Sequence, residues 1–268
     1  MRDENLERVV GGTRVFLLDL DGTVYLGEKL IGDMAATLDS IRESGRKIVF
    51  CTNNSSKSAS AYHDKLRRLG LYRSGDSVYT SGMATVSYLK RTYPGKSVYL
   101  VGTEVLRTEF ASAGIRLKEE DADLAVLAYD TTLTFEKIVR LNAMLAQGKP
   151  YIATHPDNVC PGEGVYPPDV GSFIQLFKTS SGRVPDVICG KPYTVMGDGI
   201  LAYTGARAEE VTMVGDRLNT DIQFGNNNGF RTLLVFSGET DRGKLREAPP
   251  EQIPSVAAES LNDVVPYL

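Results

Sequence analysis

The sequence predicts an α/β fold in which helices alternate with the strands of a parallel sheet. Several short apolar runs lack the alternation of a half-exposed strand and are typical of strands buried on both faces. Helical patterns separate these runs, as they do in βαβ units. The chain of 268 residues also exceeds the usual size of a single domain, so we expect one large or two unequal domains.

The expected elements follow one another from residue 15 onwards. Strand 15–20 and helix 34–44 come first, and strand 47–52 precedes a helix at 59–69 that a cluster of polar capping residues opens. The same alternation then predicts a strand at 77–79, a helix at 83–92, a strand at 97–101, a helix at 104–113, a strand at 124–128, a helix at 134–147 and a strand at 151–154. The last elements are a strand at 211–214, a helix at 221–228 and a strand at 231–236, followed by a terminal segment.

Two aspartates follow the first apolar run, Val15 to Leu18, and a glycine comes directly after them. If the run is a buried parallel strand, Asp19 and Asp21 lie at its carboxyl end, where open α/β sheets place their ligand sites. Asp19 could then attack an electrophile, and Asp21 could pass a proton to the leaving group. An ordinary exit from a strand into a turn also uses Asp and Gly, so this motif alone leaves that alternative open.

Polar side chains also follow the second strand pattern. Thr52, Asn53 and Asn54 offer hydroxyl and amide groups that donate hydrogen bonds to phosphate oxygens. Taken alone, the cluster is better explained as a cap for the next helix. Further along, Lys191 lies in a short Gly-Lys-Pro turn after an apolar run, although a single loop lysine carries little weight by itself.

The strand pattern at 211–214 ends in glycine and aspartate once more. Asp216 follows Gly215, and Asp221 comes five residues later. Two acidic side chains at the end of a strand favour a hard cation. The four motifs together therefore combine a nucleophile, hydrogen-bond donors for phosphate, a positive charge and a metal site.

These motifs, in this order, resemble those of the haloacid dehalogenase (HAD)-like hydrolase superfamily, and most of all its NagD-like, p-nitrophenylphosphatase branch (subfamily IIA). The resemblance spans nearly the whole chain. It implies a Rossmann-like doubly wound parallel sheet core at 1–82 and 184–268, with an inserted smaller α/β cap domain at 83–183. The cap is expected to gate the site, exclude water and contact the leaving group.

The resemblance also implies a role for each acidic residue. Asp19 is expected to be the nucleophile that forms an aspartyl-phosphate, and Asp21 the general acid and then the general base. Asp19, the Asp21 backbone carbonyl and Asp216 are expected to bind Mg²⁺, which neutralises the charge that several carboxylates and a phosphate bring together. Asp221 is expected to orient a metal-bound water or Lys191 rather than to bind the metal directly.

The remaining motif residues are expected to hold the phosphate: Lys191 as a point charge, and Thr52, Asn53 and Asn54 as a cup of donors. The predicted function is a Mg²⁺-dependent phosphomonoesterase for small metabolites such as sugar phosphates and nucleoside monophosphates, with p-nitrophenyl phosphate as a surrogate. Dehalogenation is not expected, because a carbon–halogen leaving group needs no proton from a second aspartate. A phosphoacceptor protein without turnover and a phosphomutase, which share the aspartyl-phosphate step, stay open as alternatives.

The loop at 153–172 resembles the substrate-specificity segment of the cap. Within it, we interpret His155 as a structural residue of a turn fixed by backbone hydrogen bonds, while Cys160 stands where some relatives carry a histidine that touches substrate. His63 is expected to be solvated on the surface of its helix. Cys51 and Cys189 lie within apolar runs and are expected in the core.

Composition excludes several classes of function. The net charge of −4 and the lack of a basic run argue against binding to nucleic acid. No apolar stretch reaches the roughly 20 residues that span a bilayer, so no membrane partner is expected. The polar, acidic N-terminus is unlike a signal peptide, and three widely spaced cysteines favour reduced thiols, which together predict a cytoplasmic protein. The partner is a small-molecule phosphomonoester, and the sequence leaves a homo-oligomer open.

Overall fold

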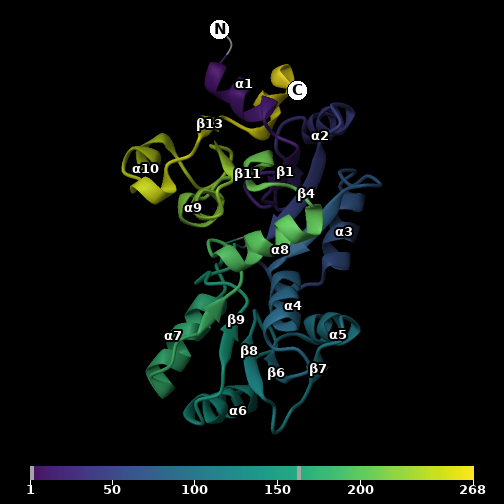
Figure 1. The fold of residues 1–268 in the computed structure, drawn as a ribbon. Helices are drawn as coiled ribbons and strands as arrows, with labels where there is room; N and C mark the ends of the chain where they lie inside the picture. The colour runs from purple at the N-terminus through teal and green to yellow at the C-terminus, as the bar shows by residue number, and fades with distance from the viewer. Residues whose placement is uncertain (1–2, 162–163) are drawn as a thin grey trace. The chain divides into compact units, whose positions relative to one another are not determined.

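The computed structural model describes residues 3–161 and 164–268, and Figure 1 shows the arrangement of its elements. The described chain divides into two compact units. The first unit holds the chain up to Thr52 together with Tyr62–Tyr79 and Ile200–Leu268, and the second unit holds Asn53–Ala61 and Thr80–Gly199. The chain therefore passes from the first unit to the second directly after Thr52.

A six-stranded sheet forms the centre of the first unit, in the order β13-β12-β11-β1-β4-β5. Its strands are β1 (Val15–Leu18), β4 (Lys47–Thr52), β5 (Ser77–Thr80), β11 (Val211–Gly215), β12 (Arg231–Val235) and β13 (Val256–Ala258). The pairs β4–β1, β1–β11, β11–β12 and β12–β13 are parallel. The chain runs from β1 to β4 on one side and returns to β11 on the other, so the strand order reverses beside β1, which is the usual ligand position in such sheets.

Helices pack against this sheet, with α2 against β4 and α9 against β11 and β12. The helical elements assigned wholly or mainly to this unit are α1 (Glu4–Gly11), α2 (Met34–Glu43), α3 (Ala59–Arg68), η1 (Ala208–Glu210), η2 (Leu218–Ile222), α9 (Gln223–Asn227), α10 (Arg242–Arg246), η3 (Pro250–Gln252) and η4 (Leu261–Tyr267), whereas α8 (Thr194–Thr204) is divided between the two units. The short hairpin of β2 (Tyr25–Leu26) and β3 (Lys29–Leu30) follows β1.

The second unit contains a five-stranded sheet in the order β10-β9-β8-β6-β7, and all its pairs are parallel. Its elements are α4 (Ser81–Thr92), β6 (Ser97–Val101), α5 (Glu104–Ser112), β7 (Arg116–Leu117), β8 (Leu124–Leu127), α6 (Phe135–Ala146), β9 (Tyr151–Ala153), α7 (Val170–Ser181) and β10 (Val187–Ile188). Apolar side chains from β6, β8 and β9 pack with those of α6 and α7 into a core, in which the rings of Tyr151 and Phe177 meet edge to face.

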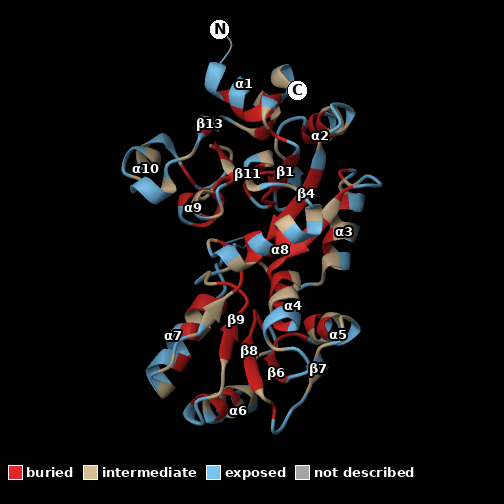
Figure 2. Ribbon diagram, viewed as in Figure 1, coloured by how far each residue is buried: buried red, intermediate tan, exposed pale blue. Residues whose placement is uncertain are grey.

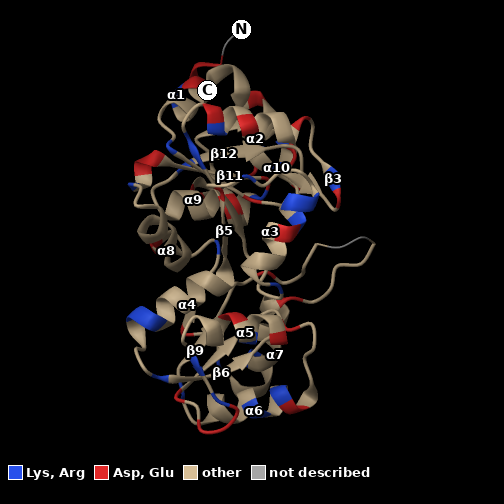
Figure 3. Ribbon diagram, turned by 90° about the vertical axis from the view of Figure 1, so that its right-hand side faces the viewer, with Lys and Arg blue, Asp and Glu red and all other residues tan. Residues whose placement is uncertain are grey.

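Burial follows this layered arrangement, because the central strands are buried and the outer faces of the helices are exposed (Figure 2). Acidic and basic residues are interspersed on the helices and loops (Figure 3). None of the helices in the described chain has both the length and the apolar character that crossing a bilayer requires.

The predicted α/β fold with parallel sheets is confirmed. Two predicted elements that end or begin near the aspartates have different bounds in the structure. β1 ends at Leu18 and not at residue 20, because the Leu20 carbonyl accepts the N–H groups of the following turn. The helix expected at 221–228 begins earlier, as the π-helical turn η2, and continues as the short α9.

Candidate active site

The aspartates of the first and fourth motifs follow neighbouring strands. Leu18 of β1 pairs in register with Val214 of β11, and the Asp19 N–H donates to the Val214 carbonyl at 2.9 Å. Asp19 follows β1, and Asp216 follows β11. Because both strands run in the same direction, the two side chains leave the sheet at the same edge.

Three buried carboxylates meet at this edge. Asp19, Asp216 and Asp221 each offer an oxygen, and these oxygens all lie within 4.8 Å of one another. Asp221 comes from η2, whose first turn folds back beside the end of β11, and its Oδ2 accepts the Arg217 N–H at 3.1 Å. The sequence predicted a supporting role for Asp221, and the structure places its carboxylate as close to the cluster as those of the expected ligands.

The two carboxylate oxygens of Asp216 differ in their hydrogen bonds, and this difference indicates that the cluster needs a cation. Its Oδ2 accepts the Glu239 N–H at 2.7 Å, whereas its Oδ1 is buried without a hydrogen-bond partner. Burial, together with the nearby charge of Asp221, raises the pKa of the Asp216 carboxyl from 3.8 to about 6. A buried anion without a partner is costly unless a cation neutralises it.

The donor set fits such a cation. Carboxylate oxygens are hard ligands, and Mg²⁺ is commonly held by one or two of them while it keeps several waters. The oxygen of Asp216 without a partner supplies a free ligand atom, and Asp19 and Asp221 supply further oxygens within reach of one ion. The residues present therefore suit a divalent metal with oxygen ligands.

Glycines make room for these carboxylates. A Cβ at Gly22, which has φ of +89°, would lie 2.4 Å from Asp216 Oδ2, and one at Gly238 would lie 2.0 Å from the same atom. A Cβ at Gly215 would lie 2.2 Å from the Asp221 Cβ. None of the four sequence motifs includes Gly238, although it comes three residues after β12, a third strand whose carboxyl end reaches this edge.

Asp21 lies on the turn between β1 and the β2–β3 hairpin. Asp21 is exposed, and it forms an isolated parallel β-bridge with Tyr25. The Gly22 N–H donates to the Tyr25 carbonyl at 2.8 Å, and the Ser237 hydroxyl donates to the Gly22 carbonyl at 2.7 Å. The turn is therefore fixed on both sides, while the Asp21 side chain reaches solvent, as exchange of a proton with substrate or water requires.

The second motif is divided between the two units, and the third motif lies in the second unit. Thr52, the buried last residue of β4, belongs to the first unit, whereas Asn53 and Lys191 belong to the second. Within the second unit, the Lys191 N–H donates to Asn53 Oδ1 at 2.8 Å, and Asn53 Nδ2 donates to the Lys191 carbonyl at 2.9 Å. The Asn53 side chain thus holds the main chain of Lys191.

The predicted specificity loop is tied to the same segment. Asn53 Nδ2 donates to Asp157 Oδ2 at 3.0 Å, and Asn54 Nδ2 lies 3.6 Å from Cys160 Sγ. Val159 and Pro168 form an antiparallel bridge across the loop. Gly162 and Glu163 of this loop lie outside the described residues.

His155 is fully buried, which agrees with the structural role we predicted, but side chains and not backbone groups hold its ring. Its Nε2 lies 3.0 Å from Asp169 Oδ1, and its Nδ1 lies 3.0 Å from Thr154 Oγ1 and 3.5 Å from Ser81 Oγ. Asp169 also caps α7, since its Oδ1 accepts the Val170 N–H at 2.6 Å. The network therefore joins β9, α4 and α7.

The prediction that His63 is solvated on the surface of its helix is only partly right, because the residue is half-buried. Its ring packs against Tyr72 with centroids 5.0 Å apart, its Nε2 is buried without a partner, and burial lowers the pKa of the imidazole. The helix pattern could not show that the segment after α3 returns to cover this ring. Cys51 and Cys189 are buried as predicted, and Cys160 is half-buried.

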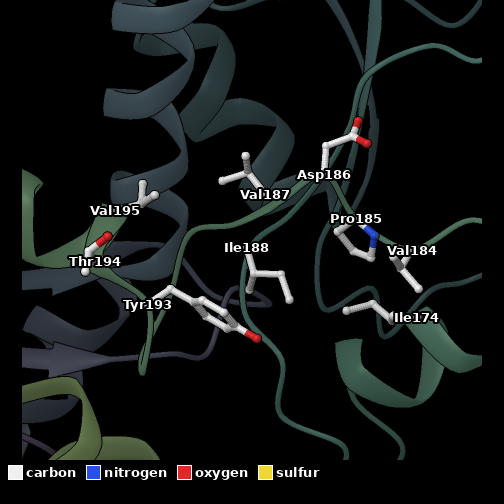
Figure 4. A pocket seen from close by; sticks show the side chains of 9 residues that line it. All are labelled: Ile174, Val184, Pro185, Asp186, Val187, Ile188, Tyr193, Thr194 and Val195. Carbon is white, nitrogen blue, oxygen red and sulfur yellow. The ribbon is translucent and has the colours of Figure 1, made fainter. Parts of the chain in front are cut away.

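An apolar groove of about 500 Å³ lies beside β10 in the second unit (Figure 4). Its lining consists of Ile174, Val184, Pro185, Asp186, Val187, Ile188, Tyr193, Thr194 and Val195. Its one charged side chain, Asp186, already accepts the Tyr151 N–H at 2.8 Å. The groove therefore lacks the converging polar groups of a phosphate site.

Known proteins share this architecture. The family model for haloacid dehalogenase-like hydrolases matches residues 16–116, and a second, HAD-hydrolase-like model matches residues 188–264. The acid sugar phosphatase of Staphylococcus epidermidis is 33% identical over 240 residues, which cover 88% of this chain and 92% of that protein. The solved 4-nitrophenylphosphatase of Thermotoga maritima has a TM-score of 0.92 at 38% identity, over 96% of this chain and 98% of that one. The glycerol phosphate phosphatase Rv1692 of Mycobacterium tuberculosis, solved in complex with magnesium, has a TM-score of 0.89 at 28% identity, over 96% of this chain and 78% of that one.

Proposed function

We propose that this chain, which belongs to the haloacid dehalogenase-like hydrolase family and is a phosphatase of small phosphorylated substrates, hydrolyses phosphomonoesters through a covalent phosphate on Asp19. The observation that carries the proposal is the buried cluster of Asp19, Asp216 and Asp221 at the carboxyl edge of a parallel sheet. A buried carboxylate beside a cation site can act as a nucleophile towards phosphorus, since the cation offsets the repulsion between the carboxylate and the phosphate.

Two proton transfers complete the proposed cycle. An Asp19 carboxylate oxygen forms a bond to phosphorus while the bond from phosphorus to the leaving oxygen breaks, and Asp21 donates a proton to that oxygen. A water then attacks the aspartyl-phosphate, Asp21 accepts the proton of this water, and the bond between Asp19 and phosphorus breaks. Inorganic phosphate leaves, and both aspartates return to their starting states. The exposed turn position of Asp21 supports this role.

Mg²⁺ is the metal we propose. Asp19, the Asp21 backbone carbonyl and Asp216 would hold it, and Asp221 would orient a bound water or Lys191, as predicted from the sequence. When bound, the ion supplies positive charge to the phosphate oxygens. The magnesium complex of Rv1692 supports this choice of metal.

Lys191, Thr52 and Asn54 are proposed to contribute charge and hydrogen bonds to the phosphate. We propose the inserted segment 83–183 as the cap of this family, with substrate choice residing in its loops. The names of the relatives support sugar phosphates and glycerol phosphate as substrate classes, and 4-nitrophenyl phosphate as a surrogate. None of the three cysteines, all of which the structure describes, forms a disulfide, which supports a cytoplasmic location.

The test is release of phosphate from p-nitrophenyl phosphate with Mg²⁺ and with EDTA, using wild type, Asp19→Asn and the control Asp64→Asn on the exposed side of α3. We expect many turnovers that EDTA abolishes, no turnover in Asp19→Asn with phosphate binding retained, and an unchanged control. More than a few per cent of wild-type rate in Asp19→Asn would remove Asp19 from the nucleophile role. A single turnover per chain would favour the phosphoacceptor alternative, and phosphoryl return to substrate would favour a phosphomutase.

A further inference from the structure

The side chain of Asn53 uses all its hydrogen-bond donors inside the protein. Its Nδ2 carries two hydrogens, one donated to the Lys191 carbonyl at 2.9 Å and the other to Asp157 Oδ2 at 3.0 Å. Its Oδ1 accepts the Lys191 N–H at 2.8 Å, and the residue is 3% exposed. A donor that is already engaged twice has no hydrogen left for a phosphate oxygen.

The paired bonds to Lys191 have the form of a strand pairing. The side-chain amide of Asn53 takes the place of a peptide group, because it accepts from the N–H and donates to the C=O of the same residue. Charged lysine side chains move easily about their flexible stems, so the main chain must be fixed if the ammonium is to occupy a constant place. Lys191 is fully buried, which agrees with a fixed position.

The residue before the lysine fits against the same amide. A Cβ at Gly190 would lie 2.6 Å from Asn53 Oδ1 and 2.8 Å from the His155 Cβ, and the Gly190 N–H donates to the Thr154 carbonyl at 2.7 Å. The turn that carries Lys191 is therefore held between Asn53 on one side and the segment after β9 on the other. The main chain of Asn53 is also fixed, because the Ser81 hydroxyl donates to the Asn53 backbone carbonyl.

We propose that the Asn53 side chain is a positioning residue, which fixes Lys191 and the start of the specificity loop at Asp157, and that it does not bind the phosphate itself. This inference rests on the proposed phosphatase function and on the proposed role of Lys191 in it. It changes the prediction made from the sequence, in which the Asn53 amide was one of the phosphate donors. It also gives the loop and the lysine a shared anchor, because one amide nitrogen contacts both.

The first test is Asn53→Asp, which keeps the size of the side chain and an oxygen for the Lys191 N–H. The substitution places a carboxylate oxygen against the Lys191 carbonyl and the Asp157 carboxylate, so both donated bonds become repulsive. We expect kcat/KM to fall by roughly 100-fold, as for a displaced catalytic group. The Mg²⁺ concentration that gives half-maximal activity should change by less than about twofold, because the side-chain contacts of Asn53 are with Lys191 and Asp157 and not with Asp19, Asp216 or Asp221.

The matched control is Asn142→Asp, also in the second unit. The Asn142 Oδ1 accepts the Ser180 hydroxyl at 2.9 Å, and an aspartate keeps that acceptor, so activity should match wild type. If Asn53→Asp does not fold, Asn53→Ser is measured in its place. Its small hydroxyl leaves space for water and adds no charge, and a loss of at least tenfold is expected from it.

Affinity for inorganic phosphate with Mg²⁺, measured by calorimetry in a double-mutant cycle with Lys191→Ala, separates positioning from direct contact without needing turnover. If Asn53 acts through Lys191, then Asn53→Ser, which adds no charge that would repel phosphate, should weaken phosphate binding in wild type but by less than about threefold once Lys191 is alanine. An equal loss in both backgrounds would mean that Asn53 contacts phosphate by itself, and would overturn the proposal.

Exchange of the two side chains distinguishes the two contacts of Asn53. In Asn53→Asp with Asp157→Asn, the donor and acceptor of the loop contact trade places, while the repulsion at the Lys191 carbonyl remains. We expect kcat/KM to stay low, and recovery to wild type would assign the effect to the loop alone and overturn the role at Lys191. Wild type without Mg²⁺-dependent turnover would refute the proposed function, whereas an active wild type with Asn53→Asp within threefold of it would refute this inference only.

Discussion

Asp216→Asn should stabilise the metal-free protein and at the same time remove its response to Mg²⁺. The Asp216 carboxylate is buried, lies beside Asp221, and has an oxygen without a partner. An asparagine keeps an oxygen for the Glu239 N–H. It replaces the other oxygen by an amide nitrogen, in a cluster whose carboxylate oxygens lie within 4.8 Å of one another and can accept its hydrogens. The substitution therefore removes a buried charge without leaving a new group unsatisfied.

The magnitude follows from the raised pKa. A rise in the Asp216 pKa from 3.8 to about 6 corresponds to about 3 kcal/mol between the charged and neutral forms. Because the folded state binds this proton more tightly than the unfolded state, this contribution is fully present below the unfolded pKa and is lost as pH rises through the folded pKa. The metal-free wild type should thus lose stability between about pH 4 and 6. At pH 8, Asp216→Asn should recover about 3 kcal/mol, or roughly 6 °C in Tm.

Thermal unfolding followed by circular dichroism measures this at pH 5 and pH 8, in EDTA and in excess Mg²⁺. The Tm advantage of Asp216→Asn in EDTA should grow as pH rises, while Mg²⁺ should raise the Tm of wild type only. The exposed Asp64→Asn variant on α3 controls for loss of a negative charge elsewhere. A metal-free Asp216→Asn less stable than wild type at pH 8, or one that Mg²⁺ stabilises as much as wild type, would refute the reasoning.

Three further outcomes are expected. Asp21→Asn should slow alkyl phosphates at least tenfold more than p-nitrophenyl phosphate in steady-state assays, and equal losses would argue against its role as the acid. Gly238→Ala, whose Cβ would lie 2.0 Å from Asp216 Oδ2, should raise the Mg²⁺ concentration for half activation at least tenfold; an unchanged titration would show that the loop yields freely. With a thiol reagent at pH 8, Cys160 should react first, because burial raises the pKa of Cys189 to about 12; fast labelling of Cys189 would contradict the buried core.

The strands were readable from the sequence where burial on both faces leaves an uninterrupted apolar run. β4 and β6 have the predicted bounds for this reason. β7 and β10 were missed because two residues cannot show a pattern. α7 was missed although Asp169 is a cap residue at its start, since the loop before it drew the interpretation towards irregular structure.

The helix α1 was also missed, although its sequence carries charge and capping signals. Glu4 and Glu7 lie in its first turn and Arg8 in its last, and Asp3 caps it through the N–H groups of Asn5 and Leu6. These acidic residues were interpreted only as evidence against a signal peptide. Polar residues near the end of a chain can therefore predict a helix cap as well as solvent exposure.

The adjacency of Asp19 and Asp216 could be predicted because both end parallel strands, and parallel strands share their carboxyl edge. The closeness of Asp221 could not be predicted in the same way, since it depends on a π-helical turn that brings residue 221 back beside Gly215. A regular α-helix over the same residues would point the side chain of residue 221 in a different direction. The carboxylate cluster is therefore set by strand order for two of its members and by local backbone geometry for the third.

The role of Asn53 shows where a motif by itself is ambiguous. Thr52 and Asn53 are neighbours in one polar motif, yet the boundary between the two units falls between them. The partner of the Asn53 amide is 138 residues further along the chain, and no periodicity connects positions that far apart. An amide that can donate to phosphate can equally donate to a carbonyl, and only the contact with Lys191 decides which of these it does here. Motif chemistry therefore predicts which groups a site needs, whereas the hydrogen-bond count of each group determines whether it remains available to the ligand.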